Sequence, residues 1–566
     1  MSETLQARLY RRLEEAPARP ALAFVDRRGG FRWWPLAEAH SGAADYGAGL
    51  VERGCGPGHR CVIVLSSDEE CATVLLGALL AGVVPLLVAP PVLQPSRHSA
   101  FLANLAHTLD VVRPRLVVAS GDFDFPAGSE WAEAGRVVAP ESLPGSGRQL
   151  ARPRPEPGDT AALQLTSGTT GVPRICRWTH AALLAALDGM ERAMRLSPDD
   201  VCFNWTPLYH DMGLVNNFLL CLTAGVPLAQ LAPTDFVVRP SRWLQGLADT
   251  GATVSWSPNF GFALATGRIE ADELEGVRLD RVRGIWNAAE RIHVETMLAF
   301  HERFAPLGLR FEALKTNFGC AENVGGATFS DPEGPFRWEE VDLGALHDQG
   351  LAVPATAATG GGPTARIASA GRPVDGMRIV IADPDGRPLP DGAVGRVLLD
   401  TPSRMAEYLN DPEATREAFA DGLLATGDLG YLRDGDLYWT GRTRERITIR
   451  GKKIDPSEFE RMLFGIVGLR PGCFVAFGIA DPRLGTERPV VVCEVADPET
   501  RPLREIAGDI HEAANAELGL TLDDVVLVER GVLAKTSSGK RRHRHFREVY
   551  ESGGLASLYR TGGNHG

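Results

Sequence analysis

Hydrophobic positions along this chain follow two different patterns. Through the first 440 residues, short apolar runs such as RCVIVLS and RLVVAS come between longer segments, such as residues 68–81 and 180–196, whose apolar residues recur at helical spacing. The short runs are typical of buried strands, and the longer ones of helices that cover them. Their alternation predicts an α/β fold with helix-covered parallel sheets.

The pattern changes at Met377, where strand-like runs are joined by DPDG and RDGD turns. Such turns favour hairpins, so residues 377–441 are expected to form a small β-rich subdomain. A further unit follows, with the strands FVAFGIA and PVVVCEVA and a helical segment. We therefore predict a large N-terminal domain, residues 1–444, and a small, mobile α+β C-terminal domain, residues 445–566.

Composition narrows the class of protein. With 566 residues the chain is too long for one ordinary core, and its net charge of −13 argues against nucleic-acid binding. The nine cysteines are scattered without metal-ligand spacing, which favours reduced thiols. The longest apolar run, residues 72–91, is broken by Gly82 and Pro85, so it predicts no membrane span. We expect a cytoplasmic protein that binds neither nucleic acid nor membrane.

One loop suggests phosphate chemistry. The apolar run TAALQL is followed by Thr166, Ser167, Gly168, Thr169, Thr170 and Gly171. Glycines let backbone N–H groups turn toward an anion, and hydroxyls supply further donors. The lysine of the common phosphate loop is missing, and the nearby cation is Arg174. By composition alone, a flexible surface loop is the commoner explanation.

Four later segments change that balance. In chain order, the five segments are LTSGTTGVPR (165–174), NFGCAEN (317–323), ATGDLGYL (425–432), GRTRERITIRGKKIDPSEFE (441–460) and LAKTSSGKRR (533–542). Together they resemble the motifs of the adenylate-forming enzymes, the superfamily of acyl-CoA synthetases, peptide-synthetase adenylation domains and luciferases. One such motif is weak, but five in the family's order make coincidence improbable.

The resemblance implies a site for ATP and Mg²⁺. It assigns the departing pyrophosphate to residues 166–171 with Arg174, and the ribose to Asp428 and Arg442, which a hairpin can bring side by side. It assigns Mg²⁺ to Glu322 with Thr170, since a hard cation prefers oxygen ligands. The residues assigned to the adenine region are Ala289, Glu290, Asn317, Phe318, Gly319, Cys320 and Ala321. Phe318 stands where relatives usually have tyrosine, so stacking is kept and a hydrogen bond is lost.

Three residues are the candidates for catalysis: Lys540, Glu322 and His210. By resemblance, Lys540 reaches the α-phosphate from the C-terminal domain and stabilises the charge that develops there. Alternatively, it merely begins the basic stretch KRRHRHFR. His210 is expected beside the bound acid, or else as a structural histidine in a turn.

The segments TPLYHDMGL (206–214) and SPNFGFAL (257–264) resemble those of fatty acyl-AMP ligases in particular. Residues 328–370 look like the insertion of those ligases, which restrains the C-terminal domain and goes with transfer to an acyl carrier protein. Asn216, Asn217, Trp256 and Phe260 are predicted to line the acid pocket. Large or polar side chains there favour a shorter, more polar or aromatic acid over a long fatty chain, unless they point elsewhere.

The leading hypothesis is therefore ATP-dependent adenylation of a small-molecule acid, with transfer to a carrier protein. A second hypothesis keeps the adenylation but makes nitrite the substrate, for reaction with an arylamine. A third is an acyl-CoA ligase, and a fourth is a non-catalytic nucleotide-binding homologue, which Arg174 and Phe318 would favour.

Overall fold

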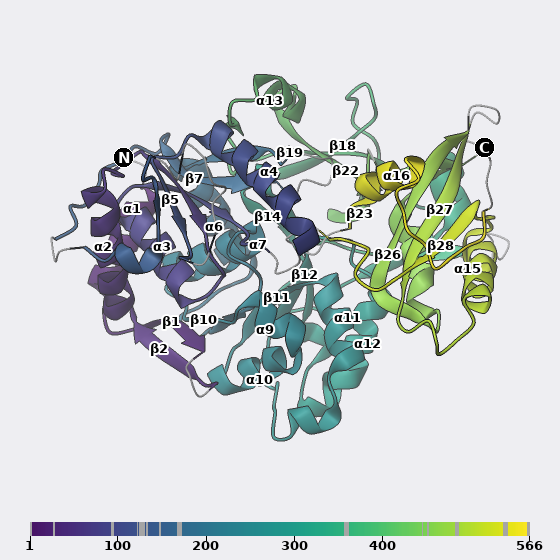
Figure 1. Ribbon diagram of the computed structural model, residues 1–566, viewed down its shortest axis with the longest axis horizontal. Helices are drawn as coiled ribbons and strands as arrows, with labels where there is room; N and C mark the ends of the chain where they lie inside the picture. The colour runs from purple at the N-terminus through teal and green to yellow at the C-terminus, as the bar shows by residue number, and fades with distance from the viewer. Residues whose placement is uncertain are drawn as a thin grey trace.

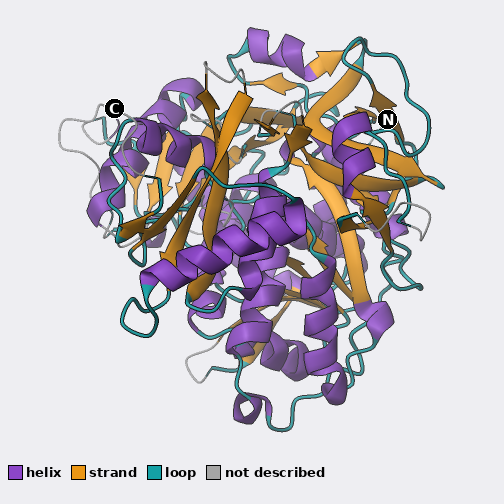
Figure 2. Ribbon diagram, turned by 90° about the vertical axis from the view of Figure 1, so that its right-hand side faces the viewer, coloured by secondary structure: helices purple, strands orange, loops and turns teal. Residues whose placement is uncertain are grey.

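A computed structural model shows a large N-terminal part and a smaller C-terminal lobe, which lies at the right of Figure 1 in yellow-green. It describes residues 3–25, 29–91, 95–121, 123, 131, 134–145, 149–166, 173–355, 362–443, 445–449, 452–481, 486–535 and 541–562. Helices cover the strands of the N-terminal part, as Figure 2 shows. The predicted fold class is confirmed.

Two large sheets form the N-terminal part. In spatial order, the nine-stranded sheet contains β17 (Arg372–Pro373), β14 (Gly325–Phe329), β13 (Leu314–Cys320), β12 (Gly284–Ala288), β11 (Val254–Pro258), β9 (Cys202–Asn204), β10 (Leu228–Gln230), β1 (Pro20–Val25) and β2 (Phe31–Pro35). The seven-stranded sheet contains β20 (Glu407–Tyr408), β8 (Ile175–Thr179), β7 (Thr160–Leu165), β4 (Val84–Val88), β3 (Arg60–Val64), β5 (Leu116–Ala119) and β6 (Val137–Val138). Their central strands run parallel.

The two helices predicted over residues 68–81 and 180–196 are present close to those positions. All helices described in this part follow in chain order. They are α1 (Leu5–Glu15), α2 (Leu36–Glu52), α3 (Glu69–Leu80), α4 (Pro95–Val112), α6 (His180–Ala193), α7 (Asp211–Gly213) with the π-helical turn Leu214–Leu219, α8 (Leu220–Ala224), α9 (Pro233–Val238), α10 (Ser241–Thr250), α11 (Asn259–Arg268), α12 (Val294–Phe304) and α13 (Pro412–Ala418). Asp68 begins α3 by accepting a hydrogen bond from the Cys71 N–H. A Cβ at Gly77 would lie 2.4 Å from the Ala43 carbonyl oxygen, so glycine allows α2 and α3 to pack closely.

The β-rich segment predicted after Met377 is a five-stranded antiparallel sheet. Its strands are β18 (Arg378–Ala382), β19 (Gly395–Asp400), β21 (Phe419–Ala420), β22 (Leu423–Arg433) and β23 (Asp436–Arg442). The RDGD turn joins β22 to β23, and in that hairpin Asp428 is the register partner of Arg442.

The described residues of the C-terminal lobe form a four-stranded sheet and three α-helices. The strands are β26 (Leu469–Asp481), β27 (Thr486–Val495), β28 (Asp524–Val528) and β29 (Tyr559–Arg560), and the helices are α14 (Pro456–Met462), α15 (Leu503–Leu518) and α16 (His543–Glu551). The short pair β24 (Ile447–Ile449) and β25 (Lys452–Ile454) precedes them.

The predicted insertion forms its own two-stranded sheet, β15 (Trp338–Asp342) with β16 (Thr364–Ala368). On one side, Glu339 accepts a hydrogen bond from the Tyr431 hydroxyl at 3.0 Å. On the other, His347 Nε2 lies 3.0 Å from a carboxylate oxygen of Glu458 in α14, and both side chains are almost fully buried. The insertion therefore contacts both the β-rich subdomain and the C-terminal lobe.

Among the described residues, none of the helices combines the length and the apolar character needed to cross a bilayer.

Candidate active site

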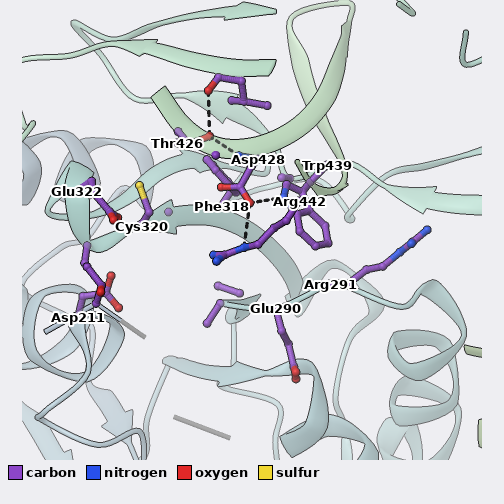
Figure 3. A pocket seen from close by; sticks show the side chains of 18 of the residues that line it. Asp211, Glu290, Arg291, Phe318, Cys320, Glu322, Thr426, Asp428, Trp439 and Arg442 are labelled. Atoms are coloured by element: carbon purple, nitrogen blue, oxygen red, sulfur yellow. Dashed lines mark hydrogen bonds and ion pairs between the residues drawn. The ribbon is translucent and has the colours of Figure 1, made fainter. Parts of the chain in front are cut away.

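A cavity of about 440 Å³ lies where the ends of β12 and β13 meet the β22–β23 hairpin and the C-terminal lobe. Ligands of open parallel sheets commonly bind at this edge. Figure 3 shows Asp211 and Glu322 on one side of the cavity, Glu290 and Arg291 on the other, and Asp428 with Arg442 between them. The predicted site residues that line it are Thr166, Arg174, His210, Asn216, Ala289, Glu290, Asn317, Phe318, Gly319, Cys320, Ala321, Glu322, Asp428 and Arg442.

Six further predicted residues lie outside the described part of the chain: Ser167, Gly168, Thr169, Thr170, Gly171 and Lys540. The residues that flank this loop on its two sides, Thr166 and Arg174, are described, and we call this pair the neck of the phosphate-type loop. There the Thr166 N–H donates to the Arg174 carbonyl at 2.8 Å, and the Arg174 N–H donates to Thr166 Oγ1 at 3.1 Å. Arg541, which follows Lys540 directly in the sequence, lines the cavity.

The β22–β23 hairpin supplies one corner of the cavity. Asp428 Oδ1 lies 3.4 Å from Arg442 Nε and accepts a hydrogen bond from Trp439 Nε1 at 2.9 Å. The backbone N–H of Asp428 donates to Thr426 Oγ1. Burial opposes the charge on Arg442, but Asp428 and Glu445 outweigh it, so the pKa of this guanidinium is raised. The corner thus presents a fixed carboxylate and a permanent cation.

Glu322 follows the end of β13 in a tight turn, Ala321–Asn323. The turn is fixed from outside, because the Glu322 carbonyl accepts a hydrogen bond from the Met405 N–H at 2.7 Å. It closes through Val324, whose φ of +55° lies in the left-handed region. The Tyr408 hydroxyl donates to Glu322 Oε1 at 2.6 Å.

The residues around Glu322 can be compared with those that bind metal ions in other proteins. No group of three His, Cys, Asp or Glu side chains is placed to hold a metal in the described ranges. Mg²⁺ is usually held by one or two carboxylates together with phosphate oxygens and water. Glu322, with Tyr408 engaging one of its two oxygens, fits that mode, in which the nucleotide supplies the other ligands.

The opposite wall follows β12. Ala289 has a φ of +72°, a left-handed conformation that is uncommon for a residue with a side chain. Next to it, Glu290 Oε1 accepts a hydrogen bond from the Phe260 N–H at 2.6 Å. This N–H belongs to the first turn of α11, where donors have no partner within the helix. Phe318, 9% exposed, lines the cavity from β13.

The predicted acid-pocket residues are separated by the structure. Asn216 lines the cavity, and its Oδ1 accepts a hydrogen bond from the Gly326 N–H at 3.2 Å. Asn217 does not line it. Its side chain is fully buried and donates to the Met212 carbonyl at 2.8 Å, while its Oδ1 accepts from the thiol of Cys202.

Trp256 and Phe260 also lie outside the lining of this cavity. Trp256 is fully buried on β11, stacked on Trp286 with ring centroids 5.5 Å apart and edge-on to Phe329. His210 does line the cavity; its Nδ1 lies 2.8 Å from a carboxylate oxygen of Asp211, at the start of α7. The histidine therefore has both the structural contact and the cavity position that the sequence left open.

The C-terminal lobe closes the cavity with side chains that sequence reasoning missed. Glu460 of α14 is almost fully buried, and its carboxylate oxygens lie 2.7 Å from His543 Nε2 and 3.2 Å from Arg541 Nη1. Glu445 lies 3.6 Å from His543 Nδ1. Burial lowers the pKa of His543, but Glu460 and Glu445 outweigh burial and raise it to about 9.

A second contact crosses the cavity between the two parts of the chain. Arg291 Nη1 donates to Ser457 Oγ at 2.6 Å and lies 3.7 Å from Asp455 Oδ1. Both acceptors stand at the start of α14, and all three residues line the cavity. No local pattern in the sequence marks these contacts, because their partners lie far apart along the chain.

Known proteins resemble this chain over most of its length. A medium-chain-fatty-acid–[acyl-carrier-protein] ligase, JamA, of Moorena producens is 29% identical over 518 residues, which cover 88% of this chain and 86% of the relative. A 4-hydroxyphenylalkanoate adenylyltransferase of Mycobacterium tuberculosis is 30% identical over 528 residues, covering 87% and 82%. A solved structure, from a study of fatty acyl-adenylate ligases of E. coli and L. pneumophila, superimposes with a TM-score of 0.88 at 26% identity and covers 98% of both chains.

The family comparison agrees with these relatives. The model of the AMP-binding enzyme family matches residues 9–409, well over half of the chain. Enzymes of this family form adenylates from ATP, which accords with a cavity that combines Phe318, Glu322, Asp428 and Arg442. The chain belongs to the family of AMP-binding enzymes, the adenylate-forming ligases.

Proposed function

We propose that this protein converts a carboxylic acid into an acyl-adenylate, with release of pyrophosphate, and passes the acyl group to the thiol of a carrier protein. The observation that carries the proposal is the meeting of Glu322, Phe318 and the Asp428–Arg442 pair in one cavity. These residues provide a metal ligand, an aromatic face and a carboxylate–guanidinium pair within one site. That set suits the three parts of ATP.

In this proposal Phe318 packs on the adenine, and Asp428 accepts hydrogen bonds from the ribose hydroxyls while Arg442 holds it in place. Asp428 suits this role because its position is fixed by Trp439 and by strand register. Pyrophosphate leaves toward residues 166–171, which begin at the closed neck between Thr166 and Arg174. When bound, Mg²⁺ would neutralise phosphate charge next to Glu322.

The reaction is an in-line displacement. A carboxylate oxygen of the acid bonds to the α-phosphorus, and the bond from that phosphorus to the bridging oxygen of pyrophosphate breaks. Lys540, carried next to the cavity-lining Arg541, is proposed to stabilise the negative charge on the α-phosphate oxygens as this happens. Its placement rests on the motif resemblance, since Lys540 lies outside the described residues.

We propose that the acid is shorter or more polar than a long fatty chain. Asn216 brings an amide to the cavity beside Gly325. Ala288 lines the cavity, and on the same two strands the fully buried indole rings of Trp256 and Trp286 stack on each other; we propose that they limit the length of the acid. The mycobacterial relative is named for a 4-hydroxyphenylalkanoate, which is a precedent for an acid that carries a polar aromatic ring.

Transfer to a carrier protein is supported by the name of the relative JamA, a ligase for an acyl carrier protein. We propose that residues 445–566 rotate about Glu445 between adenylation and transfer. Such a rotation must break the contacts of Arg291 with Ser457 and Asp455.

Acid-dependent exchange of labelled pyrophosphate into ATP tests the proposal. Purified protein with Mg²⁺ is screened against linear acids of 2–16 carbons, aryl acids, aryl-alkanoic acids and amino acids, and then against nitrite with an arylamine. Exchange with compact carboxylic acids is expected. ATP consumption with nitrite and amine alone would select the nitrite hypothesis, and ATP binding without exchange across the panel would select the non-catalytic homologue.

A further inference from the structure

Tyr408 is a buried residue at the cavity that the sequence motifs do not include. It lies on the two-residue strand β20, opposite Cys176 of β8. Its backbone N–H donates to Thr415 Oγ1 at 2.9 Å, and its side chain is 7% exposed. The backbone of Tyr408 is therefore held both by its neighbouring strand and by Thr415 of α13.

The hydroxyl of Tyr408 points at the proposed metal carboxylate. The distance of 2.6 Å to Glu322 Oε1 is that of a short hydrogen bond to a charged acceptor. An ordinary phenol is protonated at neutral pH and can donate this hydrogen bond. A donor held against one oxygen can fix the orientation of the carboxylate and leave its second oxygen for another ligand.

The ring of Tyr408 contacts the neck of the phosphate-type loop. The Arg174 guanidinium lies over the ring, 5.2 Å from its centroid, and its Nε is 3.6 Å from Asp411 Oδ2. Backbone hydrogen bonds tie Arg174 to Thr166 across that neck. One side chain thus touches the cation beside the loop and the carboxylate beside the cavity, which are 148 residues apart in sequence.

We propose that Tyr408 is a positioning residue that orients Glu322 toward the metal ion of the bound nucleotide and holds Arg174 next to it. This role rests on the proposed function, because it requires a metal–nucleotide complex in the cavity. Removing a residue that hydrogen-bonds a metal ligand typically lowers the affinity for the metal by about 10–100-fold. Tyr408 stands in that relation to Glu322.

The competing explanation is that Tyr408 only stabilises the fold. The chain offers a matched control, because Tyr431 donates to Glu339 at 3.0 Å in the same way. Tyr431 is also fully buried, and neither it nor Glu339 lines the cavity. If the Tyr408–Glu322 hydrogen bond were only structural, removing it should affect Mg²⁺-dependent binding no more than removing the Tyr431–Glu339 hydrogen bond.

The test is Mg²⁺-dependent binding of α,β-methylene-ATP to the full-length protein, measured by calorimetry. Tyr408→Phe keeps the ring and removes only the hydroxyl, and its melting temperature is measured alongside. We expect the Mg²⁺ concentration for half-maximal enhancement of analogue binding to rise about 10–100-fold. Binding of the analogue in EDTA should stay within about twofold of the wild type, and Tyr431→Phe should leave both values unchanged.

Glu322→Gln gives a second comparison. Since Tyr408 acts through the carboxylate, adding Tyr408→Phe to Glu322→Gln should change the Mg²⁺ dependence by less than about twofold. An unchanged Mg²⁺ dependence in Tyr408→Phe, or an equal shift in Tyr431→Phe, overturns the positioning role. If the wild type binds no analogue with or without Mg²⁺, the proposed function itself is wrong as well.

Discussion

The two sides of the cavity are built in different ways. On the N-terminal side, Asp428 and Arg442 face each other because they are register partners in one hairpin, and backbone hydrogen bonds hold the two strands. On the C-terminal side, Glu460, Arg541 and His543 meet through side-chain charges alone. The first arrangement survives any movement of the C-terminal lobe.

This difference suggests that the N-terminal side serves mainly to bind the nucleotide and the C-terminal side serves mainly the chemical steps. A corner fixed by strand register can hold a nucleotide throughout a reaction cycle. The charged side chains of the other face pair with one another inside the C-terminal lobe, so that face can leave and return without breaking those pairs. We therefore expect variants on the N-terminal side to change ATP affinity, and variants on the C-terminal side to change rates or the stability of the closed form.

The largest effect is expected at Lys540. Lys540→Ala should lower the rate of acid-dependent pyrophosphate exchange by about 10²–10³-fold, because a positioned donor to developing charge is lost. ATP affinity, measured by equilibrium dialysis, should remain within about threefold. Arg544→Ala, which removes an exposed cation from the same basic stretch, is the control and should keep the wild-type rate. Undiminished exchange in Lys540→Ala would contradict the assigned role.

The next largest effect is expected at Asp428. Asp428→Ala should weaken ATP binding by about 100-fold, since each hydrogen bond to a charged group contributes about 1.5–3 kcal/mol. Calorimetric titration with ATP measures this directly. Asp436, at the other end of β23, bonds Ser369 and Arg372 outside the proposed nucleotide corner. Asp436→Ala should lower the melting temperature but keep ATP affinity, and equal losses of affinity in both variants would argue against a ribose contact.

The remaining effect concerns stability and its dependence on pH. His543 has a folded pKa of about 9, above its ordinary value of 6.5, so its contribution to stability is complete below pH 6.5 and is lost as pH rises through 9. The full difference corresponds to about 3 kcal/mol at most. Urea midpoints at pH 6.5 and 9.5 should therefore differ less in His543→Gln than in the wild type.

His545 provides the control on the same helix. Burial lowers the pKa of His545, so folding does not stabilise its charge. His545→Gln should keep the wild-type pH dependence. If His543→Gln keeps it too, the charge of His543 does not stabilise the C-terminal face.

Local sequence patterns predicted much of the fold and part of the site. Turn residues predicted the hairpin that pairs Asp428 with Arg442, and strand-to-helix alternation predicted the sheets whose ends form the cavity. Tyr408 and His543 were not predicted, because they bond Glu322 and Glu460, which lie 86 and 83 residues away. Contacts at such separations leave no periodic signal.

Adjacent residues of the same type show a second reason why the sequence did not specify the whole site. Asn216 and Asn217 looked equivalent in sequence, yet one helical step turns Asn217 away from the cavity toward Met212 and Cys202. Trp256 lies on a buried strand, where the sequence gives the side-chain size but not which space it fills. Side-chain direction in a π-helical turn depends on packing, which a residue pattern does not specify.

The buried contact between His347 and Glu458 has a consequence for protein engineering. A chimera that exchanges residues 445–566 alone would replace Glu458 and leave an imidazole without its acceptor in a closed interior. Exchanging the insertion together with that segment keeps the couple intact. The two pieces should therefore be transplanted as one module, although residues 371–444 separate them along the chain.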